Sequence, residues 1–224
     1  AAKFASDKAG VDVAVDAYRL FWRDPIERAG QRLYTAKGNH DFTIKHDADT
    51  PAGFTYSAEA ARAVVMGSKG CAAAVTNTAD PTACYYYVDN AAARLRYIVA
   101  DTTDAIDPTR TYWAVTYGMG PTQLTWLAEQ ALATIPAGWS AVVIHHIPLT
   151  GCVGDDGDRR RFAPFRSLLE AYQNRGRATV AGKTHDFADA KGRILLDLTG
   201  HVLDAGAVEL AHRVRLLELV LLCH

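Results

Sequence analysis

The sequence lacks several features that would assign a function at once. It has no Cys-x-x-Cys pair among its four cysteines, and its net charge is only −1. The first absence argues against a structural zinc site, and the second gives no reason to expect a polyanion such as nucleic acid as a partner. No apolar run is long enough to span a bilayer, and no signal peptide is visible. We therefore expect a cytoplasmic protein without a membrane partner.

The cysteines are too scattered to form an obvious framework. Cys71 and Cys84 bracket a loop rich in alanine and threonine, and an oxidising compartment would allow a disulfide between them. Their count and spacing do not resemble a disulfide scaffold, so free thiols are expected. Cys152 follows His146 closely, and it either lines the same cleft or is a buried neutral thiol.

Length and composition are those of an ordinary globular protein. The 224 residues fit a single domain, residues 1–224, with a sizeable core. Hydrophobic residues make up 49% and charged residues 22% of the chain. The end of the chain, about residues 205–224, is atypical because it is very apolar, and it suits an amphipathic helix or a poorly formed tail equally. If undocked, it would be an aggregation or dimerisation surface.

Hydrophobic periodicity predicts helices that alternate with strands. Helices are expected at about 11–29, from Ser57, from Pro121 to about Ile135, and at 162–174. Their expected inward residues are Val11, Val15, Tyr18 and Trp22 in the first, Leu124, Leu127, Ala128, Ala131 and Leu132 in the third, and Phe165, Leu168, Leu169 and Tyr172 in the fourth. Strands are expected at 32–36, about 84–89, about 94–101, 140–144 and 193–198. Ser57 suits a helix N-cap, and Pro121 suits the first turn of a helix. This alternation argues for an α/β layered domain.

Four residues after the first predicted strand carry the most information: Gly38-Asn39-His40-Asp41. An asparagine oxygen can ligate a metal, a histidine can transfer a proton, and an aspartate can fix the histidine tautomer. On their own, these residues suit a plain turn as well as a site.

Two further predicted strands also end in histidines. The apolar run 140–144 leads into His145-His146-Ile147-Pro148, and the run 193–198 leads into Gly200-His201. Ligands usually gather at the carboxyl ends of strands in open α/β sheets. One such histidine would be explained as a core residue, but three strand ends of this kind favour a site.

In this order, the motifs resemble those of the calcineurin-like metallophosphoesterases. That family carries Asp-x-His, Gly-Asp, Gly-Asn-His-Asp, His-x-Pro at a strand end, and Gly-His-x-His. The third motif is complete at Gly38–Asp41, the fourth is His146-Ile147-Pro148, and the fifth is half present, with Leu203 in place of its second histidine. The resemblance covers roughly residues 10–204.

The resemblance implies a fold and a chemistry. The fold would be a layered α-β-β-α sandwich of the metallophosphoesterase type, with its first strand or strands missing. The activity would be hydrolysis of phosphate esters by divalent Mn, Zn or Fe, normally two ions about 3.5 Å apart. Asn39, His146 and His201 would ligate one ion, His40 would protonate the leaving oxygen, and Asp41 would orient His40. The substrate would be a phosphorylated small molecule, a nucleotide or a phosphodiester.

The chain also departs from the family pattern. Neither Asp-x-His nor Gly-Asp precedes Gly38, and the candidate carboxylates there are Asp7, Asp12 and Asp16. Asp12 and Asp16 fall in a predicted amphipathic helix with their side chains toward solvent. With Leu203 unable to ligate, this chain would hold one metal rather than two. Two readings stay open: an enzyme of which this is the larger part, or a degenerate member that acts as a metal-binding or interaction scaffold.

Two other motifs are weaker. The segment 176–184 approaches a phosphate-binding loop, but it has one residue too many between its glycines and no clear helix after them. The acidic run 155–158 resembles a calcium loop in composition only, and we expect a solvated loop there.

Overall fold

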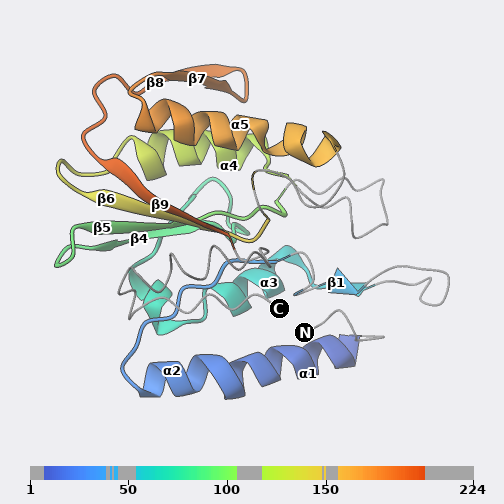
Figure 1. Cartoon of the computed structure of the whole chain (residues 1–224). Helices are drawn as coiled ribbons and strands as arrows, with labels where there is room; N and C mark the ends of the chain where they lie inside the picture. The colour runs from blue at the N-terminus through green and yellow to red at the C-terminus, as the bar shows by residue number, and fades with distance from the viewer. Residues whose placement is uncertain are drawn as a thin grey trace.

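The computed structural model describes residues 8–38, 41, 43–44, 54–104, 118–147, 149 and 156–199 (Figure 1). Its N-terminal elements are α1 (Lys8–Tyr18), η2 (Arg19–Arg23), α2 (Asp24–Arg28), β1 (Thr43–Ile44), β2 (Phe54–Thr55), α3 (Ala58–Val65), η3 (Lys69–Ala73) and β3 (Val75–Thr76). The later elements are β4 (Tyr86–Asn90), β5 (Leu95–Val99), α4 (Pro121–Trp126), η5 (Leu127–Leu132), β6 (Ser140–His145), α5 (Asp156–Gln173), β7 (Arg177–Val180), β8 (Lys183–Asp186) and β9 (Arg193–Thr199).

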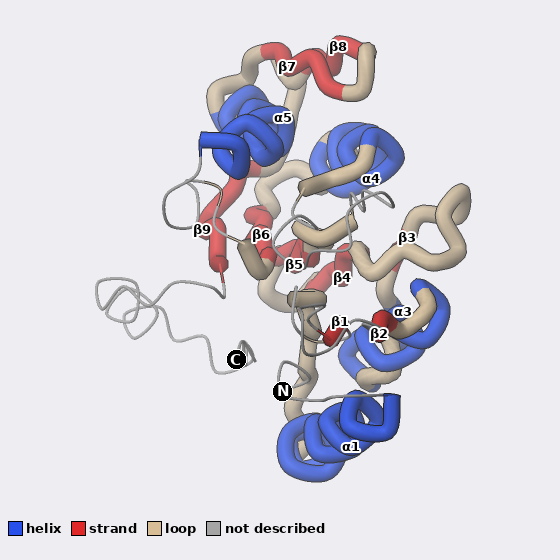
Figure 2. The backbone as a smooth tube through the Cα atoms, turned by 90° about the vertical axis from the view of Figure 1, so that its right-hand side faces the viewer, coloured by secondary structure: helices blue, strands red, loops and turns tan. Residues whose placement is uncertain are grey.

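A mixed five-stranded sheet forms the centre of the described fold, in the order β3, β4, β5, β6, β9. The first two pairings are antiparallel, whereas β5, β6 and β9 run parallel. Strand β6 is buried along its whole length, as expected where helices cover both faces of a sheet. Figures 1 and 2 show α4 and α5 on one face and α1 and α3 on the other. The predicted α/β class is therefore correct.

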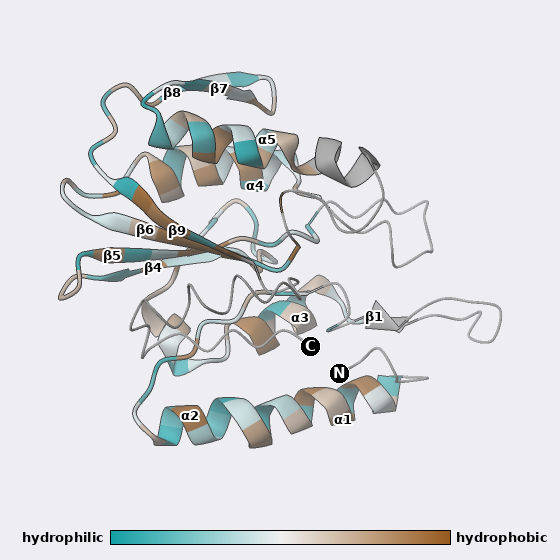
Figure 3. Ribbon diagram, viewed as in Figure 1, coloured by the Kyte–Doolittle hydropathy of each residue, from teal (hydrophilic) through white to brown (hydrophobic). Residues whose placement is uncertain are grey.

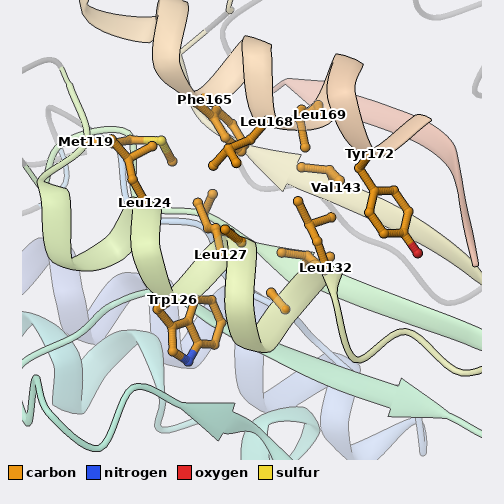
Figure 4. Close-up of a cluster of buried hydrophobic side chains, with 14 of the residues drawn as sticks. Met119, Leu124, Trp126, Leu127, Leu132, Val143, Phe165, Leu168, Leu169 and Tyr172 are labelled. Atoms are coloured by element: carbon orange, nitrogen blue, oxygen red, sulfur yellow. The ribbon is translucent and has the colours of Figure 1, made fainter. Parts of the chain in front are cut away.

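The face under α4 and α5 holds the larger apolar cluster (Figure 4). The helix from Pro121 runs through α4 into η5, and it buries the predicted residues Leu124, Leu127, Ala128, Ala131 and Leu132. Helix α5 contributes Phe165, Leu168 and Tyr172, as its periodicity predicts. Brown strands between the two helical layers mark the same core in Figure 3.

Helix α5 begins earlier than expected. Its first residue is Asp156 rather than one near 162, so Asp156 and Gly157 are helical and not part of a solvated loop. Acidic residues are favourable in the first turn of a helix because they complement its dipole. The acidic composition that suggested a loop therefore also suits a helix start.

The prediction of a strand at 32–36 is wrong. Residues 31–38 form no helix or strand, although Leu33, Tyr34 and Ala36 are buried. Side chains satisfy part of this backbone: the Tyr86 hydroxyl accepts from Thr35 N at 2.9 Å and donates to Thr35 O at 3.1 Å. The ring of Tyr34 stacks on that of Tyr97 at 5.1 Å between centroids. An apolar run predicts burial correctly, but it does not reveal whether a partner strand is present.

A glycine lets this segment pack closely against η3. A Cβ at Gly70 would lie 2.5 Å from the carbonyl oxygen of Leu33, which leaves no space for a side chain. The Ser68 hydroxyl is 2.7 Å from the same carbonyl oxygen. Residues 31–38 are thus held between η3 and the sheet.

The N-terminal helix has nearly the predicted length, but only some of the residues predicted to face inward are buried. α1, η2 and α2 follow one another from Lys8 to Arg28. Val11 is fully buried, and the Tyr18 hydroxyl lies 2.9 Å from Thr35 Oγ1. Trp22, expected on the inner face, is instead 40% exposed. The π-helical turn of η2 places more than four residues in a turn, which shifts the face that Trp22 presents.

Three smaller predictions can also be checked. Ser57 caps α3, because Ala60 N donates to its hydroxyl at 3.2 Å. Cys71 and Cys84 are buried free thiols. The segment 176–184 forms the hairpin of β7 and β8, with no helix after its second glycine, so it is not a phosphate-binding loop.

Candidate functional site

The carboxyl ends of three parallel strands meet at one edge of the sheet. Val99 pairs with Ile144, and His145 pairs with Thr199, so β5, β6 and β9 end side by side. The loop after β5 contacts the loop after β6 through a hydrogen bond from Ile147 N to Thr102 Oγ1 of 3.1 Å. This is the edge where the sequence predicts a site.

The Gly38–Asp41 motif and His146 meet at this edge. Gly38 N donates to Asp41 Oδ2 at 2.7 Å. A Cβ at Gly38 would lie 3.0 Å from that same oxygen and 3.2 Å from His146 Nδ1. Two predicted site residues therefore approach one point of the backbone, and the absence of a side chain at Gly38 is what allows it.

The other predicted site residues lie outside the described part of the chain. These residues are Asn39, His40 and His201, and Leu203 and Cys152 lie outside it as well. The structure does place the end of β9 at Thr199, two positions before His201, next to His145. The convergence of all three proposed ligands therefore stays a prediction.

His145 has a different environment from its neighbour. Its ring lies edge-on to that of Phe165 at 5.8 Å, so it faces the α5 side of the sheet. Its Nδ1 is 2.7 Å from Ile147 O, and its Nε2 is 2.8 Å from Asp197 Oδ1. Both ring nitrogens are occupied by protein oxygens. Of the two histidines, His146 is the one whose ring lies beside Gly38.

A buried polar cluster lies directly beneath the motif, and sequence reasoning missed it. Lys37 Nζ is 2.6 Å from Asp101 Oδ2, and Asp101 Oδ1 accepts from Thr103 N at 2.8 Å. Asp104 Oδ2 accepts from Gln123 Nε2 at 3.0 Å and from Gly120 N at 3.1 Å. The available signal was weak: an aspartate just after a strand and a lysine just before a glycine.

Burial and charge determine how this cluster titrates. Burial is the largest influence on Lys37 and opposes its charge, but the charge and hydrogen bond of Asp101, together with Cys84 and Asp104, outweigh it, so the pKa of Lys37 is above its ordinary value. Burial, followed by repulsion from Asp101, raises the pKa of Asp104. One ammonium thus lies near two carboxyl groups, and the pKa of the Asp104 carboxyl is above its ordinary value.

The candidate replacements for the missing carboxylates are not placed at this edge by any observed contact. Asp12 accepts a hydrogen bond from Tyr56 and pairs with Lys8 at 2.6 Å. Asp16 lies on the exposed side of α1, 3.6 Å from Arg19. Asp7 lies outside the described residues. Asp12 is therefore committed to contacts on the helix surface.

Of the three predicted metal ligands, the described residues include His146. They contain no group of three histidine, cysteine, aspartate or glutamate side chains close enough to hold an ion. The His146 ring and the Asp41 carboxylate lie beside the position that a Cβ at Gly38 would take. An imidazole nitrogen and an amide oxygen are donors that suit Zn, Mn or Fe. The predicted donor set of Asn39, His146 and His201 therefore fits such a metal in its chemistry.

No protein-family model, no curated protein and no solved structure matches this chain. Among the described helices, none has both the length and the apolar character needed to cross a membrane.

Proposed function

We propose that the protein is a metal-dependent phosphoesterase of the calcineurin-like type, acting in the cytoplasm on a phosphorylated small molecule, a nucleotide or a phosphodiester. Its complete fold would be the layered α-β-β-α sandwich of that family. The observation that carries the proposal is the approach of Asp41 and His146 to Gly38 at the edge where β5, β6 and β9 end. A plain turn at Gly38–Asp41 would not require a histidine from another strand beside it.

The residues divide into two roles. Asn39, His146 and His201 would hold one divalent ion. A bound divalent ion polarises the phosphoryl oxygens and lowers the pKa of bound water. His40 would donate a proton to the leaving oxygen, and Asp41 would fix the tautomer of His40. The bond from Gly38 N to Asp41 Oδ2 supports this role, because it gives the carboxylate a fixed orientation.

A second function is favoured by one observation. Asp101, at the end of β5, is paired with Lys37 of the same chain at 2.6 Å, so its charge is already balanced without a metal. Leu203 also removes a ligand from the family pattern. A non-catalytic scaffold that binds one metal, or a partner, would have these properties.

Metal analysis tests whether the protein has a metal site at all. Purified protein should retain Zn²⁺ or Mn²⁺, and His146→Ala should lose it. His185→Ala is the matched control, because His185 is also buried, at 8% exposure against 5% for His146, but lies on β8. Assays with one phosphomonoester and one phosphodiester then distinguish an enzyme from a scaffold. Equal metal retention by wild type and His146→Ala would refute the metal-dependent enzyme and the metal-binding scaffold.

A further inference from the structure

The ion pair of Lys37 and Asp101 is unusual among the charge pairs of the described residues because both side chains are well buried. Their exposures are 17% and 3%, and Nζ lies 2.6 Å from Oδ2. A buried charge without its partner is strongly unfavourable, so the ammonium has one low-energy position. The pair thus fixes the end of the Lys37 side chain in space.

Asp101 is itself a rigid anchor. Its Oδ1 accepts from both the backbone N and the hydroxyl of Thr103, at 2.8 and 2.7 Å. Its backbone N donates to Gln123 Oε1, and its backbone O accepts from Gln123 Nε2, each at 2.9 Å. Asp101 is therefore held by its own loop through its carboxylate and by α4 through its backbone.

Lys37 directly precedes the functional motif. Gly38 follows it in the chain and donates from its backbone N to Asp41 Oδ2 at 2.7 Å. The side chains of Asp41 and His146 fill the space where a Cβ of residue 38 would lie, so the backbone of Gly38 cannot shift toward them without displacing them. A fixed Lys37 therefore limits where Gly38 and Asp41 can lie.

We propose that Lys37, anchored on Asp101, is a positioning residue that holds Gly38 and Asp41 beside His146. The proposal depends on the proposed function only for its effect on metal affinity. Its effect on the geometry of the segment does not require a metal.

A purely stabilising role is the alternative, and the chain contains a matched control. Lys8 and Asp12 form a pair with the same 2.6 Å separation, but their side chains are 64% and 42% exposed. Lys8→Met removes a lysine–aspartate pair on a helix surface, where such pairs contribute little. Lys37→Met removes the buried one.

The first measurement uses metal-free protein. In Lys37→Met, the amide of Gly38 should exchange with solvent about tenfold faster or more, and the His146 ring resonances should shift, while amides of Val142 and Val143 in β6 change little. Lys8→Met should match wild type at every position. Lys37→Arg should restore protection, because arginine can still pair with Asp101. If Lys37→Met fails to fold, Asp101→Asn gives the same test, because it retains the acceptor for Thr103 and removes the charge.

If Lys37→Met speeds amide exchange at Gly38 by the same factor as at Val142 and Val143, Lys37 only stabilises the fold, and the proposal is overturned. The second measurement is Zn²⁺ titration, in which Lys37→Met should bind about tenfold to about a hundredfold more weakly, the usual cost of losing a residue that supports a ligand. Failure of the wild type to bind Zn²⁺ would instead count against the proposed function, and the exchange data would still decide the role of Lys37.

Discussion

His145 on β6 and Asp197 on β9 are joined across two parallel strands, with Nε2 of the imidazole 2.8 Å from Oδ1 of the carboxylate. The other ring nitrogen lies 2.7 Å from the carbonyl oxygen of Ile147. Each ring nitrogen of His145 thus lies within hydrogen-bonding distance of a protein oxygen. These contacts direct both nitrogens toward the protein, and this separates His145 from His146.

The two adjacent histidines should therefore fail in different ways when replaced. His145→Ala should lower the free energy of unfolding by about 2 kcal/mol, because it removes a buried ring that packs beside Phe165 and has a hydrogen-bond partner at each nitrogen. It should weaken metal binding only modestly. His146→Ala should abolish metal retention. Chemical denaturation and Zn²⁺ titration of both variants measure the two effects.

Asp197→Asn is a useful companion to His145→Ala. The amide can still accept from His145 Nε2 but carries no charge, so its cost should be smaller. If His145→Ala loses the metal and His146→Ala retains it, the assignment is off by one residue along β6.

Gly38→Ala should damage the site more than the fold. The new Cβ would lie 3.0 Å from Asp41 Oδ2 and 3.2 Å from His146 Nδ1, so one of these side chains has to move by a few tenths of an ångström. Gly176→Ala is the control, because its nearest atoms are 3.9 and 4.0 Å from the added Cβ. We expect weaker Zn²⁺ binding only for Gly38→Ala, measured by titration. Equal affinities in the two variants would mean that His146 does not need its present position.

The raised pKa of Asp104 predicts a specific pH dependence of stability. A carboxyl group with a raised pKa in the folded state binds more protons there than in the unfolded chain. Its contribution to stability is full below the unfolded value near 3.8 and is lost as the pH rises through the folded pKa. Asp104→Asn retains an oxygen acceptor for Gln123 and Gly120 but cannot ionise. The variant should therefore gain on wild type as the pH increases.

Denaturant unfolding at about pH 4.5 and about pH 7.5 measures this gain. The stability difference between Asp104→Asn and wild type should be larger at the higher pH. Asp16→Asn, at an exposed position on α1, provides the comparison for a general loss of negative charge. A difference between Asp104→Asn and wild type that does not change with pH would show that Asp104 is not held in an environment that favours its neutral form.

Much of the described fold could be predicted from local pattern. Leu124, Leu127 and Leu132 recur at helical spacing, and β6 is a continuous apolar run. Both patterns predict a buried element directly from the sequence, and the structure buries both. The segment 32–36 could not be predicted in the same way, because an apolar run is buried whether or not a strand lies beside it. Its backbone bonds go to the side chains of Tyr86 and Ser68, which are distant in sequence.

The site shows the same division. His146 was found from its register before a proline, and Asp41 from its motif. The pairing of Lys37 with Asp101 joins residues 64 positions apart, as their numbers show, and depends on the path of a segment that was expected to be a strand. Neither residue type, taken alone, indicates a buried partner. The positions of Asn39, His40 and His201 stay predictions.

The buried thiols should be unreactive in the native protein. Burial raises the pKa of Cys84 to about 12, although the nearby Lys37 lowers it in part, and burial also raises the pKa of Cys71. The thiolate is the reactive form, so iodoacetamide at about pH 8 should leave both residues unmodified until denaturant is added. Peptide mass spectrometry resolves the two positions. Rapid labelling of Cys84 without denaturant would show that the region around Lys37 opens in solution.

The final prediction concerns catalysis by these 224 residues. Two-metal hydrolysis needs a bridging carboxylate, and neither described candidate supplies one. Asp12 is bonded to Tyr56 and Lys8, and Asp16 is exposed and pairs with Arg19. Leu203 cannot ligate. The loss of one metal removes several kcal/mol of transition-state stabilisation, and about 1.4 kcal/mol is tenfold in rate. The chain should therefore show little or no phosphoesterase activity with added Mn²⁺ or Zn²⁺.

A longer chain that carries the family's two upstream motifs, together with Leu203→His, should gain activity, and His40→Ala in that background should remove it. Hydrolysis of one phosphomonoester and one phosphodiester measures both effects. The comparison needs all three proteins, because a gain without dependence on His40 would indicate a contaminating phosphatase. Robust turnover by the unmodified chain that His40→Ala abolishes would contradict the prediction. In that case other carboxylates complete the centre, and Asp7, Asp12 and Asp204 are the first to replace.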